Sequence, residues 1–286
     1  MRVVGRELVG GEGVIYLATR VSRKVGGPEE IIRELGDVGR VERLLSSVIR
    51  MGHHSVLEHS LVRLWVECDH RELARSLLNH KYVEVTLGEP SIVSMNPRAA
   101  IELLGSDARE LGLEAIRELP LISRIMGLEC PGEPRLEVKL RRISESPLVY
   151  SVIESPHPDP RHGFYAFWME MSRVASHQFV RHRRLSFTQR SGRVTRPEGF
   201  IFPEVDGRAL EMMREYSERG LRLYEELLRM GVSMEDARYV LPAALKTALF
   251  VSGRQADWHH FLRLRMDQSA QREIREIARV IAGVVR

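Results

Sequence analysis

The sequence predicts a mixed α/β fold of the α+β kind, with an antiparallel sheet packed with helices and a helical C-terminal third. Three observations favour this class. Residues 61–66 and 164–169 are rich in β-branched and aromatic residues, as strands are. A segment with the apolar spacing of a helix follows each of them, so we expect both strands in the sheet. From Gly207 onward, apolar residues recur at helical spacing over most of the chain.

The N-terminal part is expected to begin with a short strand that ends at the Gly10-Gly11 turn. Apolar residues three or four apart predict a helix over residues 41–51 with one buried face, and Gly52 stands where this helix would end. The strand over residues 61–66 is then followed by a predicted helix over residues 71–80.

The middle of the chain gives weaker signals. Helices are expected around residues 99–104 and 108–119. Two Pro-rich pieces, residues 131–134 and 155–160, enclose a short segment that resembles a strand.

The C-terminal third is predicted to consist of helices with buried apolar stripes. Asp206 can cap the first, and Ser233 with Asp236 resembles a capping box for the next, which Pro242 would interrupt. Asp267 is the expected cap of the last helix. The first stripe consists of Ala209, Met213, Tyr216, Leu223, Leu227 and Met230, and the last of Ile274, Ile277, Ala278, Ile281 and Val285.

Two passages of the chain have the same order of features. His59 and His162 each precede a predicted strand and then a predicted helix, and a gapless comparison aligns residues 70–81 with residues 172–183. We therefore predict an internal duplication, with residues 1–133 as a degenerate copy and residues 134–286 as the second. Two unrelated strand and helix units are the alternative.

Composition restricts the class of protein. The 286 residues have a formal charge of +4 and a sequence pI near 9.3, which suits anionic partners such as nucleotides or nucleic acid. No apolar run is long enough to span a membrane, so we expect a cytoplasmic protein. Cys68 and Cys130 are far apart, and we expect both to be small core residues.

The densest group of candidate site residues lies between Arg181 and Arg193. Arginines alternate there with hydroxyl side chains and a glycine, a combination that suits phosphoryl groups and uracil-like edges. A basic nucleic-acid surface is the alternative. Only Phe179 and Phe187 could stack on bases, which makes nucleic acid the less favoured partner.

The same segment resembles the signature of a known family. Arg181-His182-Arg183, seven residues and then Ser191 resemble the signature of the flavin-dependent thymidylate synthases. Four further elements resemble family motifs and occur in family order: Ala18-Thr19-Arg20-Val21-Ser22, Gly52-His53-His54-Ser55-Val56-Leu57-Glu58-His59, Ala237-Arg238-Tyr239-Val240-Leu241-Pro242, and His260-Phe261 with Arg265 and Ala270-Gln271-Arg272-Glu273-Ile274-Arg275. The resemblance covers residues 18–90 and 162–285.

The resemblance implies a methyltransferase that converts deoxyuridine monophosphate (dUMP) to thymidylate. It implies tightly bound FAD, with NADPH and methylenetetrahydrofolate as co-substrates. Arg265 would be the catalytic residue, because it would favour ionisation of the uracil. The implied substrate residues are Gln178, Arg181, Gln189, Arg190, Ser191, Gly192, Arg193, Arg238 and Arg265. The implied cofactor residues are His53, Ser55, Glu58, Arg181, His182, Arg183, Gln189, Arg254 and His260.

Two departures from the family pattern affect these expectations. Arg254-Gln255-Ala256 replaces the family's Asn-x-Arg, so flavin binding could differ, and a catalytically altered flavin- or nucleotide-binding paralogue is a second interpretation. Before the second predicted strand, Arg161 stands where the family has glutamate, whereas Glu58 in the first copy keeps it.

The resemblance also implies a homo-oligomer, either a dimer or a tetramer, because the family builds each flavin site from several subunits of a homotetramer. A fused double unit would replace the tetramer by a homodimer. The first copy, with Asn79-His80-Lys81 and Glu89 at the signature positions, is expected to bind no nucleotide. No metal site is expected, because the spacing of His157, His162, His177, His259 and His260 is irregular.

Overall fold

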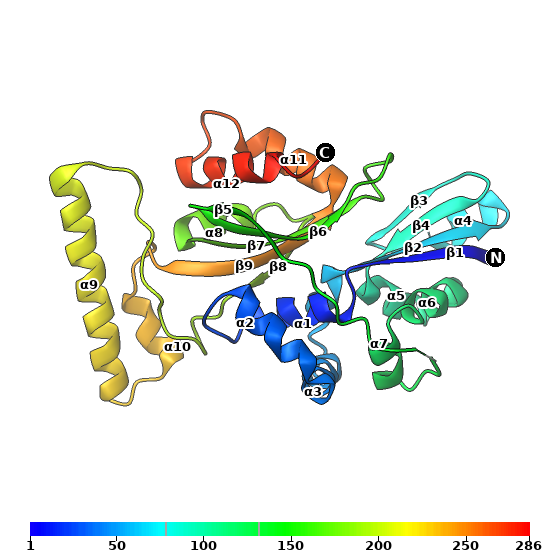
Figure 1. Cartoon of the computed structure of the whole chain (residues 1–286), viewed down its shortest axis with the longest axis horizontal. Helices are drawn as coiled ribbons and strands as arrows, with labels where there is room; N and C mark the ends of the chain where they lie inside the picture. Colours follow the sequence, from blue (N-terminus) through cyan, green and yellow to red (C-terminus); the bar gives the residue numbers. More distant parts are fainter. Residues whose placement is uncertain (78, 131) are drawn as a thin grey trace.

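Two antiparallel sheets form the framework of the protein, and helices cover them (Figure 1). The computed structural model describes residues 1–77, 79–130 and 132–286. The four-stranded sheet has the order β1 (Arg2–Val9), β2 (Leu61–Glu67), β4 (Ser91–Met95) and β3 (Val83–Thr86). The five-stranded sheet has the order β5 (Arg141–Glu145), β6 (Leu148–Ser155), β7 (Phe164–Ser172), β9 (Lys246–Arg254) and β8 (Ser186–Gln189). The mixed α/β class predicted from the sequence is confirmed.

The helices divide between residues 1–133, here called the first half of the chain, and residues 134–286, the second half. The first half contains α1 (Glu12–Val21), α2 (Pro28–Ile32), η1 (Arg33–Gly36), α3 (Val38–Arg50), η2 (His54–His59), α4 (His70–Leu77), α5 (Pro97–Leu103), α6 (Arg109–Ile116) and α7 (Pro120–Ile125). The second half contains α8 (Arg173–Phe179), α9 (Gly207–Arg229), α10 (Met234–Ala237), η3 (Arg238–Val240), α11 (Gln255–Arg265) and α12 (Arg272–Ala282). Of the described helices, none is both long and apolar enough to cross a membrane.

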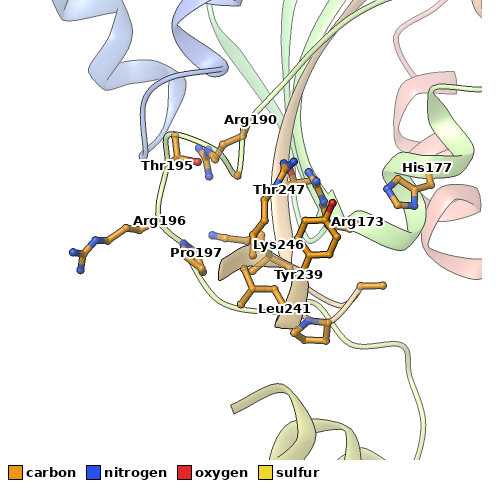
Figure 2. A pocket seen from close by; sticks show the side chains of 15 residues that line it. Arg173, His177, Arg190, Thr195, Arg196, Pro197, Tyr239, Leu241, Lys246 and Thr247 are labelled. Atoms are coloured by element: carbon orange, nitrogen blue, oxygen red, sulfur yellow. The ribbon is translucent and has the colours of Figure 1, made fainter. Parts of the chain in front are cut away.

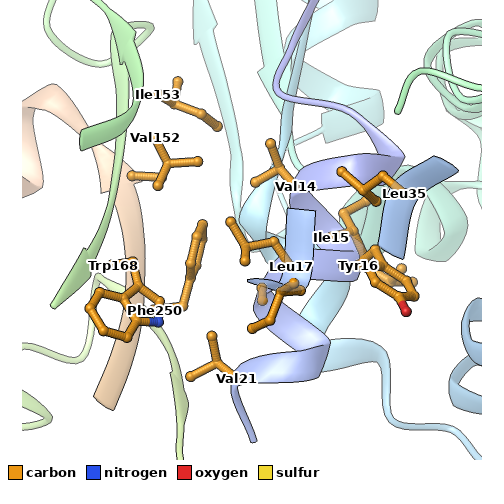
Figure 3. Close-up of a cluster of buried hydrophobic side chains, with 14 of the residues drawn as sticks. Val14, Ile15, Tyr16, Leu17, Val21, Leu35, Val152, Ile153, Trp168 and Phe250 are labelled. Carbon is orange, nitrogen blue, oxygen red and sulfur yellow. The ribbon is translucent and has the colours of Figure 1, made fainter. Parts of the chain in front are cut away.

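The five-stranded sheet is buried on both faces. On one face, Leu17 of α1 belongs to the same buried cluster as Trp168 of β7 and Phe250 of β9 (Figure 3). On the other face, Phe261 of α11 and Ile277 of α12 lie in a second buried cluster. Burying each of these side chains stabilises the fold by about 1.5–3 kcal/mol. The first half of the chain therefore completes the core of a sheet that belongs to the second half.

The strand order of the first sheet recurs in the second. The order β1-β2-β4-β3 corresponds to β6-β7-β9-β8, and all neighbours are antiparallel in both. The register agrees as well. Thr86 lies opposite Ile92, as Thr188 lies opposite Phe250. Trp65 also lies opposite Ile92, as Trp168 lies opposite Phe250.

The connections between corresponding strands differ in a reciprocal way. Residues 10–60, with α1 to α3 and η2, connect β1 to β2, whereas residues 156–163 alone connect β6 to β7. Residues 190–245, with α9 and α10, connect β8 to β9, whereas residues 87–90 alone connect β3 to β4. Each half therefore carries one long connection that the other half lacks.

Most expected elements are present, with bounds that shift by a few residues. The predicted helices over residues 41–51, 71–80, 99–104 and 108–119 correspond to α3, α4, α5 and α6. Ser233 accepts a hydrogen bond from the backbone of Asp236, as expected of the capping box. Two residues of the predicted segments lie outside the described residues: Leu78, in the helix predicted over residues 71–80, and Pro131, in the first Pro-rich piece.

The structure differs from the sequence prediction at several points. Residues 246–254 form the interior strand β9 rather than helix, because a short, fully buried strand has a continuous apolar run that its period cannot distinguish from a buried helix. The last helix is capped by Gln271 rather than Asp267, and Asp206 makes no side-chain cap bond. The strands β2 and β7 belong to different sheets. Cys68 and Cys130 are half-buried rather than core residues.

The apolar stripe predicted to be buried on α9 is exposed. Met213, Tyr216, Leu223 and Met230 are between 39% and 73% exposed. Only Ser217, Gly220 and Tyr224 of this helix are buried. The helix stands at one side of the body and contacts it through α10 and η3 (Figure 1). The stripe follows the helical period, but no other described part of this chain lies over it.

Candidate functional site

A cationic cavity of about 380 Å³ lies beside β9 in the second half (Figure 2). Three segments that are distant in sequence enclose it: the start of α8, the loop after β8, and the segment from η3 into β9. The charged and polar residues that line it include Arg173, His177, Arg190, Arg196, Arg238 and Lys246. Its size lies within the range of small-ligand sites.

The arginines of the cavity are only partly neutralised. Arg190 pairs with Glu198, and Lys246 lies 3.1 Å from Glu170. For Arg173, burial lowers the pKa of the guanidinium, and the positive charge of Arg238 lowers it further. Within the described residues, no carboxylate lies within ion-pair distance of Arg173 or Arg238. Their mutual repulsion would be relieved by an anion, so the cavity is suited to a phosphate or carboxylate group.

Hydrogen bonds from the first half of the chain fix the loop after β8. The backbone N–H of Ser191 donates to the carbonyl of Ser22 at 3.1 Å, at the end of the Ala-Thr-Arg-Val-Ser element. The guanidinium of Arg190 donates to the carbonyl of Gly26 at 2.9 Å, and the N–H of Gly26 donates to Glu198 at 3.0 Å. Two motifs that lie far apart in the sequence therefore meet at the edge of the cavity.

A second cluster of predicted residues lies at the C-terminal end of α8. The Nε atom of Arg265 donates to Nε2 of His182 at 2.8 Å, and its Nη2 atom donates to the carbonyl of Gln178 at 3.2 Å. Burial lowers the pKa of His182 to about 4, and the charge of Arg265 lowers it as well. His182 is therefore neutral near pH 7 and accepts the bond from Arg265. We call Arg265, His182 and Gln178 the Arg265 cluster.

The two groups of residues are joined through α8 and β8. His177 lines the cavity, and the next residue, Gln178, bonds to Arg265. Gln189 donates from its amide to Ser176 of α8 at 3.0 Å and to Thr247 of the cavity at 3.3 Å. A ligand that extended from the cavity along α8 would meet both groups.

The last residues of the Gly52–His59 element contact the second sheet. Glu58 accepts a hydrogen bond from Ser186 of β8 at 2.7 Å and pairs with Arg98 at 2.7 Å. His59 is completely buried beneath β8 and β9. By contrast, His53 and Ser55 lie exposed at the surface. Glu58 and His59 are therefore the members of this element that contact the signature segment.

The side chain of Arg254 forms a contact between the two halves of the chain. Its guanidinium donates to Glu84 at 2.6 Å and to the carbonyl of Tyr82 at 2.8 Å, both beside β3. Burial lowers the pKa of Arg254. The small cavity of about 30 Å³ beside Arg254 and Glu58 has room for little more than a water molecule. The structure thus gives Arg254 a bridging contact within this chain.

The predicted site residues fall into separate places in a single chain. The cavity includes Arg190, Gly192 and Arg238, with Gln189, Ser191 and Arg193 in the adjoining strand and loop. The Arg265 cluster has His260 beside it. Four predicted residues are exposed, namely Arg181, Arg183, His53 and Ser55, and Glu58 and Arg254 hold the halves together. Within the described residues, no cluster of metal-ligating side chains is present.

Sequence reasoning missed several residues of the cavity. Arg173, Arg196 and Lys246 supply much of its charge, and Tyr239 contributes an exposed aromatic ring. Arg173 begins the helix that precedes the signature, and its alignment with Arg71 is the only signal in the sequence. The apolar pattern places Lys246 in a helix, which conceals its position at the start of β9.

The fold and the cavity define an α/β protein with a cationic cavity beside its second sheet. The family model described as thymidylate synthase complementing protein, Thy1, matches residues 133–286, more than half of the chain. The chain belongs to this family, as the sequence motifs predict.

Three proteins, each named flavin-dependent thymidylate synthase, illustrate the similarity. The protein of Sulfurisphaera tokodaii is 41% identical over 123 residues, which cover 41% of this chain and 48% of that protein. The protein of Thermococcus onnurineus is 37% identical over 167 residues, or 54% of this chain and 64% of that protein. The protein of Geobacter sulfurreducens is 38% identical over 135 residues, or 43% and 58%. The chain thus matches about half to less than two thirds of the length of these relatives.

Proposed function

We propose that this chain is a flavin-dependent thymidylate synthase, which methylates dUMP to thymidylate. The cationic cavity carries the proposal, because Arg173 and Arg238 leave positive charge for a phosphate beside the signature loop. The phosphate of dUMP would bind there, with Arg190, Ser191, Gly192 and Arg193 around the nucleotide. The names and the family of the similar proteins support the same reaction.

The Arg265 cluster suits the uracil ring. The guanidinium of Arg265 is held by His182 and Gln178, so its remaining donors are oriented before a ligand binds. A fixed guanidinium stabilises the anion that develops on the ring, because preorganised donors need no rearrangement. Gln178 would bind the same ring. Among the described residues that line the cavity there is no cysteine, so ring activation through arginine fits the residues present.

The residues present also fit a flavin cofactor. Arg181 and Arg183 are exposed, and within the described residues no carboxylate lies within ion-pair distance of either, whereas Arg184 pairs with Asp257 at 2.9 Å. Such free guanidinium groups suit the diphosphate of FAD. His53, Ser55, Gln189 and His260 would complete the site. Bound reduced flavin would supply the hydride, with methylenetetrahydrofolate as carbon donor and NADPH as reductant.

Two findings bear on the alternative functions, a nucleic-acid-binding protein and a catalytically altered paralogue. Phe179 is completely buried and stacks on Phe261, so it cannot offer its face to a nucleic-acid base. The bonds of Arg254 to Glu84 and Tyr82 account for the departure at residues 254–256 as a contact between the halves. A catalytically altered paralogue would still bind flavin and nucleotide.

The experiment that tests the proposal uses the purified full chain. We expect it to bind FAD, to change its flavin absorbance when dUMP is added, and to release tritium from [5-³H]dUMP in the presence of methylenetetrahydrofolate and NADPH. Protein that binds flavin and dUMP without releasing tritium would be the altered paralogue. Protein that binds neither would overturn the proposal.

Replacing Arg238 by alanine should raise the dissociation constant of dUMP about 10- to 100-fold, because a charge-assisted hydrogen bond contributes roughly 1.5–3 kcal/mol. Deoxyuridine, which lacks the phosphate, should bind the variant and the parent alike. Titration calorimetry measures both affinities, with Arg279→Ala on the exposed side of α12 as the control. An equal loss of affinity for the nucleoside would show that Arg238 does not contact the phosphate.

We further propose that two chains associate through α9. The residues Ala209, Met213, Tyr216, Gly220, Leu223, Leu227 and Met230 alternate in steps of four and three, which is the seam of a two-stranded coiled coil. Gly220 allows the helix to approach its own η3, since a Cβ there would lie 2.9 Å from the carbonyl of Val240. Of the remaining members of the seam, Leu227 is half-buried and the others are exposed in the described part of the chain, and a helix so little packed gains stability from a partner.

Charge complementarity selects a second copy of this chain as the partner. An antiparallel pair of α9 helices centred near Leu223 would bring Arg219 of each helix close to Glu226 of the other. Both side chains are exposed in the single chain. The twofold contact is self-complementary, as dimer interfaces are.

Replacing Leu223 by glutamate should halve the molecular mass in solution. The parent is expected to be a dimer. In the variant, the glutamate in the apolar seam of each helix would face the same charge in the other helix and separate the two chains. Light scattering after size exclusion measures the mass, and Glu225→Ala, on the exposed side away from the seam, is the matched control. A parent mass of one or four chains, or an unchanged mass in the variant, would contradict this interface.

A further inference from the structure

A histidine from the first half is inserted beneath the strands of the second sheet. His59 is completely buried, with Nδ1 2.8 Å from the hydroxyl of Ser252 on β9 and Nε2 2.9 Å from the hydroxyl of Thr188 on β8. Ser252 donates its own proton toward the carbonyl of Glu58 at 3.4 Å. Nδ1–H of His59 therefore donates to Ser252, and Nε2 accepts from Thr188.

A histidine from the second half makes the reciprocal contact. His162 is also completely buried, with Nδ1 2.6 Å from the hydroxyl of Ser94 on β4 and Nε2 2.8 Å from the hydroxyl of Thr86 on β3. The strands β3 and β4 are the counterparts of β8 and β9 in the shared strand order. Each histidine thus joins a serine and a threonine on corresponding strands of the other sheet.

The two reciprocal contacts differ in the segment that comes after the threonine. Thr188 is next to Gln189, after which the chain enters the loop with Arg190 and Ser191 at the cavity. Thr86 is followed by the short turn of residues 87–90, which contributes to none of the described cavities. Thr86 also donates to Asp159 at 2.7 Å and accepts from Arg161 at 2.9 Å, so it has two supports besides His162.

We infer that residues 1–133 and 134–286 are two copies of one unit that have kept complementary parts, and that His59 is a positioning residue for the nucleotide site of the second copy. Through Thr188, His59 fixes the end of β8 and with it the loop that carries Arg190 and Ser191. His162 is the equivalent bridge from the second copy into the first, where none of the described cavities borders the turn after Thr86. The inference about His59 rests on the proposed nucleotide function; the two-copy organisation rests on topology alone.

The two nitrogens of His59 can be tested separately. Asparagine places an amide near Nδ1 and can retain the contact with Ser252, whereas glutamine reaches to the position of Nε2 and can retain the contact with Thr188. We expect His59→Gln to bind dUMP within about threefold of the parent. His59→Asn and His59→Ala should raise KM for dUMP by about 10-fold or more, with a smaller change in kcat, since the reacting groups are untouched.

His162→Ala is the matched control. It removes the same pair of hydrogen bonds from an equally buried position, so its loss of stability against urea should resemble that of His59→Ala. Its KM for dUMP should remain within about twofold of the parent. Equal KM values for the two alanine variants would overturn the positioning role of His59, as would failure of glutamine to restore binding where asparagine succeeds.

Hydrogen exchange keeps the test independent of the proposed reaction. His59→Ala should speed amide exchange at residues 186–191 and leave residues 83–86 protected. His162→Ala should leave residues 186–191 protected and speed exchange at residues 83–86 to a smaller extent, because Asp159 and Arg161 still hold Thr86. If the parent binds no dUMP while exchange follows this pattern, the proposed function fails and the reciprocal bridges stand. If exchange rises equally in both sheets in each variant, the bridges do not act locally, and the inference fails whatever the protein binds.

Discussion

Replacing Arg265 by alanine is expected to lower the rate of tritium release from [5-³H]dUMP by about 100- to 1000-fold. This is the loss caused by removal of one preorganised donor from a developing anion. In the structure Arg265 is half-exposed, and its hydrogen bonds to His182 and Gln178 aim it while leaving capacity for a ligand. The flavin absorbance of the variant should persist, because other residues are proposed to hold the cofactor.

Arg265→Lys distinguishes charge from geometry. A lysine keeps the positive charge but cannot bond His182 and Gln178 at once through a planar fork. We therefore expect turnover between that of the parent and that of the alanine variant. Single-turnover measurements with saturating dUMP separate the chemical step from binding. Parent-like turnover in Arg265→Ala would reject this assignment, and Arg279→Ala on α12 controls for the loss of a surface charge.

The parts of the site that the sequence predicted are those carried by short motifs. The family and the mixed α/β class are confirmed. Residues next to one another in a motif share a strand or a helix end, so Arg190 and Gly192 reach the same cavity. The order of the motifs did not predict which of them touch, and the structure shows that Ser191 donates a hydrogen bond to Ser22.

The parts that the sequence could not predict depend on contacts between distant segments. The periodicity of α9 indicates an apolar face but does not tell whether the same chain covers it, and here Tyr216 and Leu223 are exposed. The pattern of β9 suggests helix because its burial on both faces removes the alternation of a half-buried strand. Arginine is a residue type that often binds anions, but the guanidinium of Arg254 already donates to Glu84, which lies far away in the sequence.

Mild acid should unfold this protein, because three buried histidines are held neutral. Burial lowers the pKa of His59 to about 3, and burial is also the main cause that lowers the pKa of His162 and of His182 to about 4 each. An unfolded histidine has a pKa near 6.5. Below that pH the unfolded chain takes up protons that the folded chain excludes, so the free energy of unfolding falls as the pH falls.

The size of the effect is set by the linkage between proton binding and unfolding. Each of these histidines should lower the free energy of unfolding by about 2 kcal/mol between pH 7 and pH 5, and the three by roughly 6 kcal/mol together. Domains are stable by only about 5–15 kcal/mol, so most of the stability should be lost before pH 4. Carboxylates with lowered pKa values, such as Glu34 at about 2, add to the loss at still lower pH.

Substitution of the bridging histidines separates their contribution from that of the carboxylates. Urea unfolding at pH 7, 6 and 5 gives the slope of stability against pH, which counts the protons taken up on unfolding. His59→Gln and His162→Gln should each reduce this slope by about 1.4 kcal/mol per pH unit below pH 6, and the double variant by about twice that. A slope unchanged by these substitutions would mean that the two buried histidines bind protons in the folded chain.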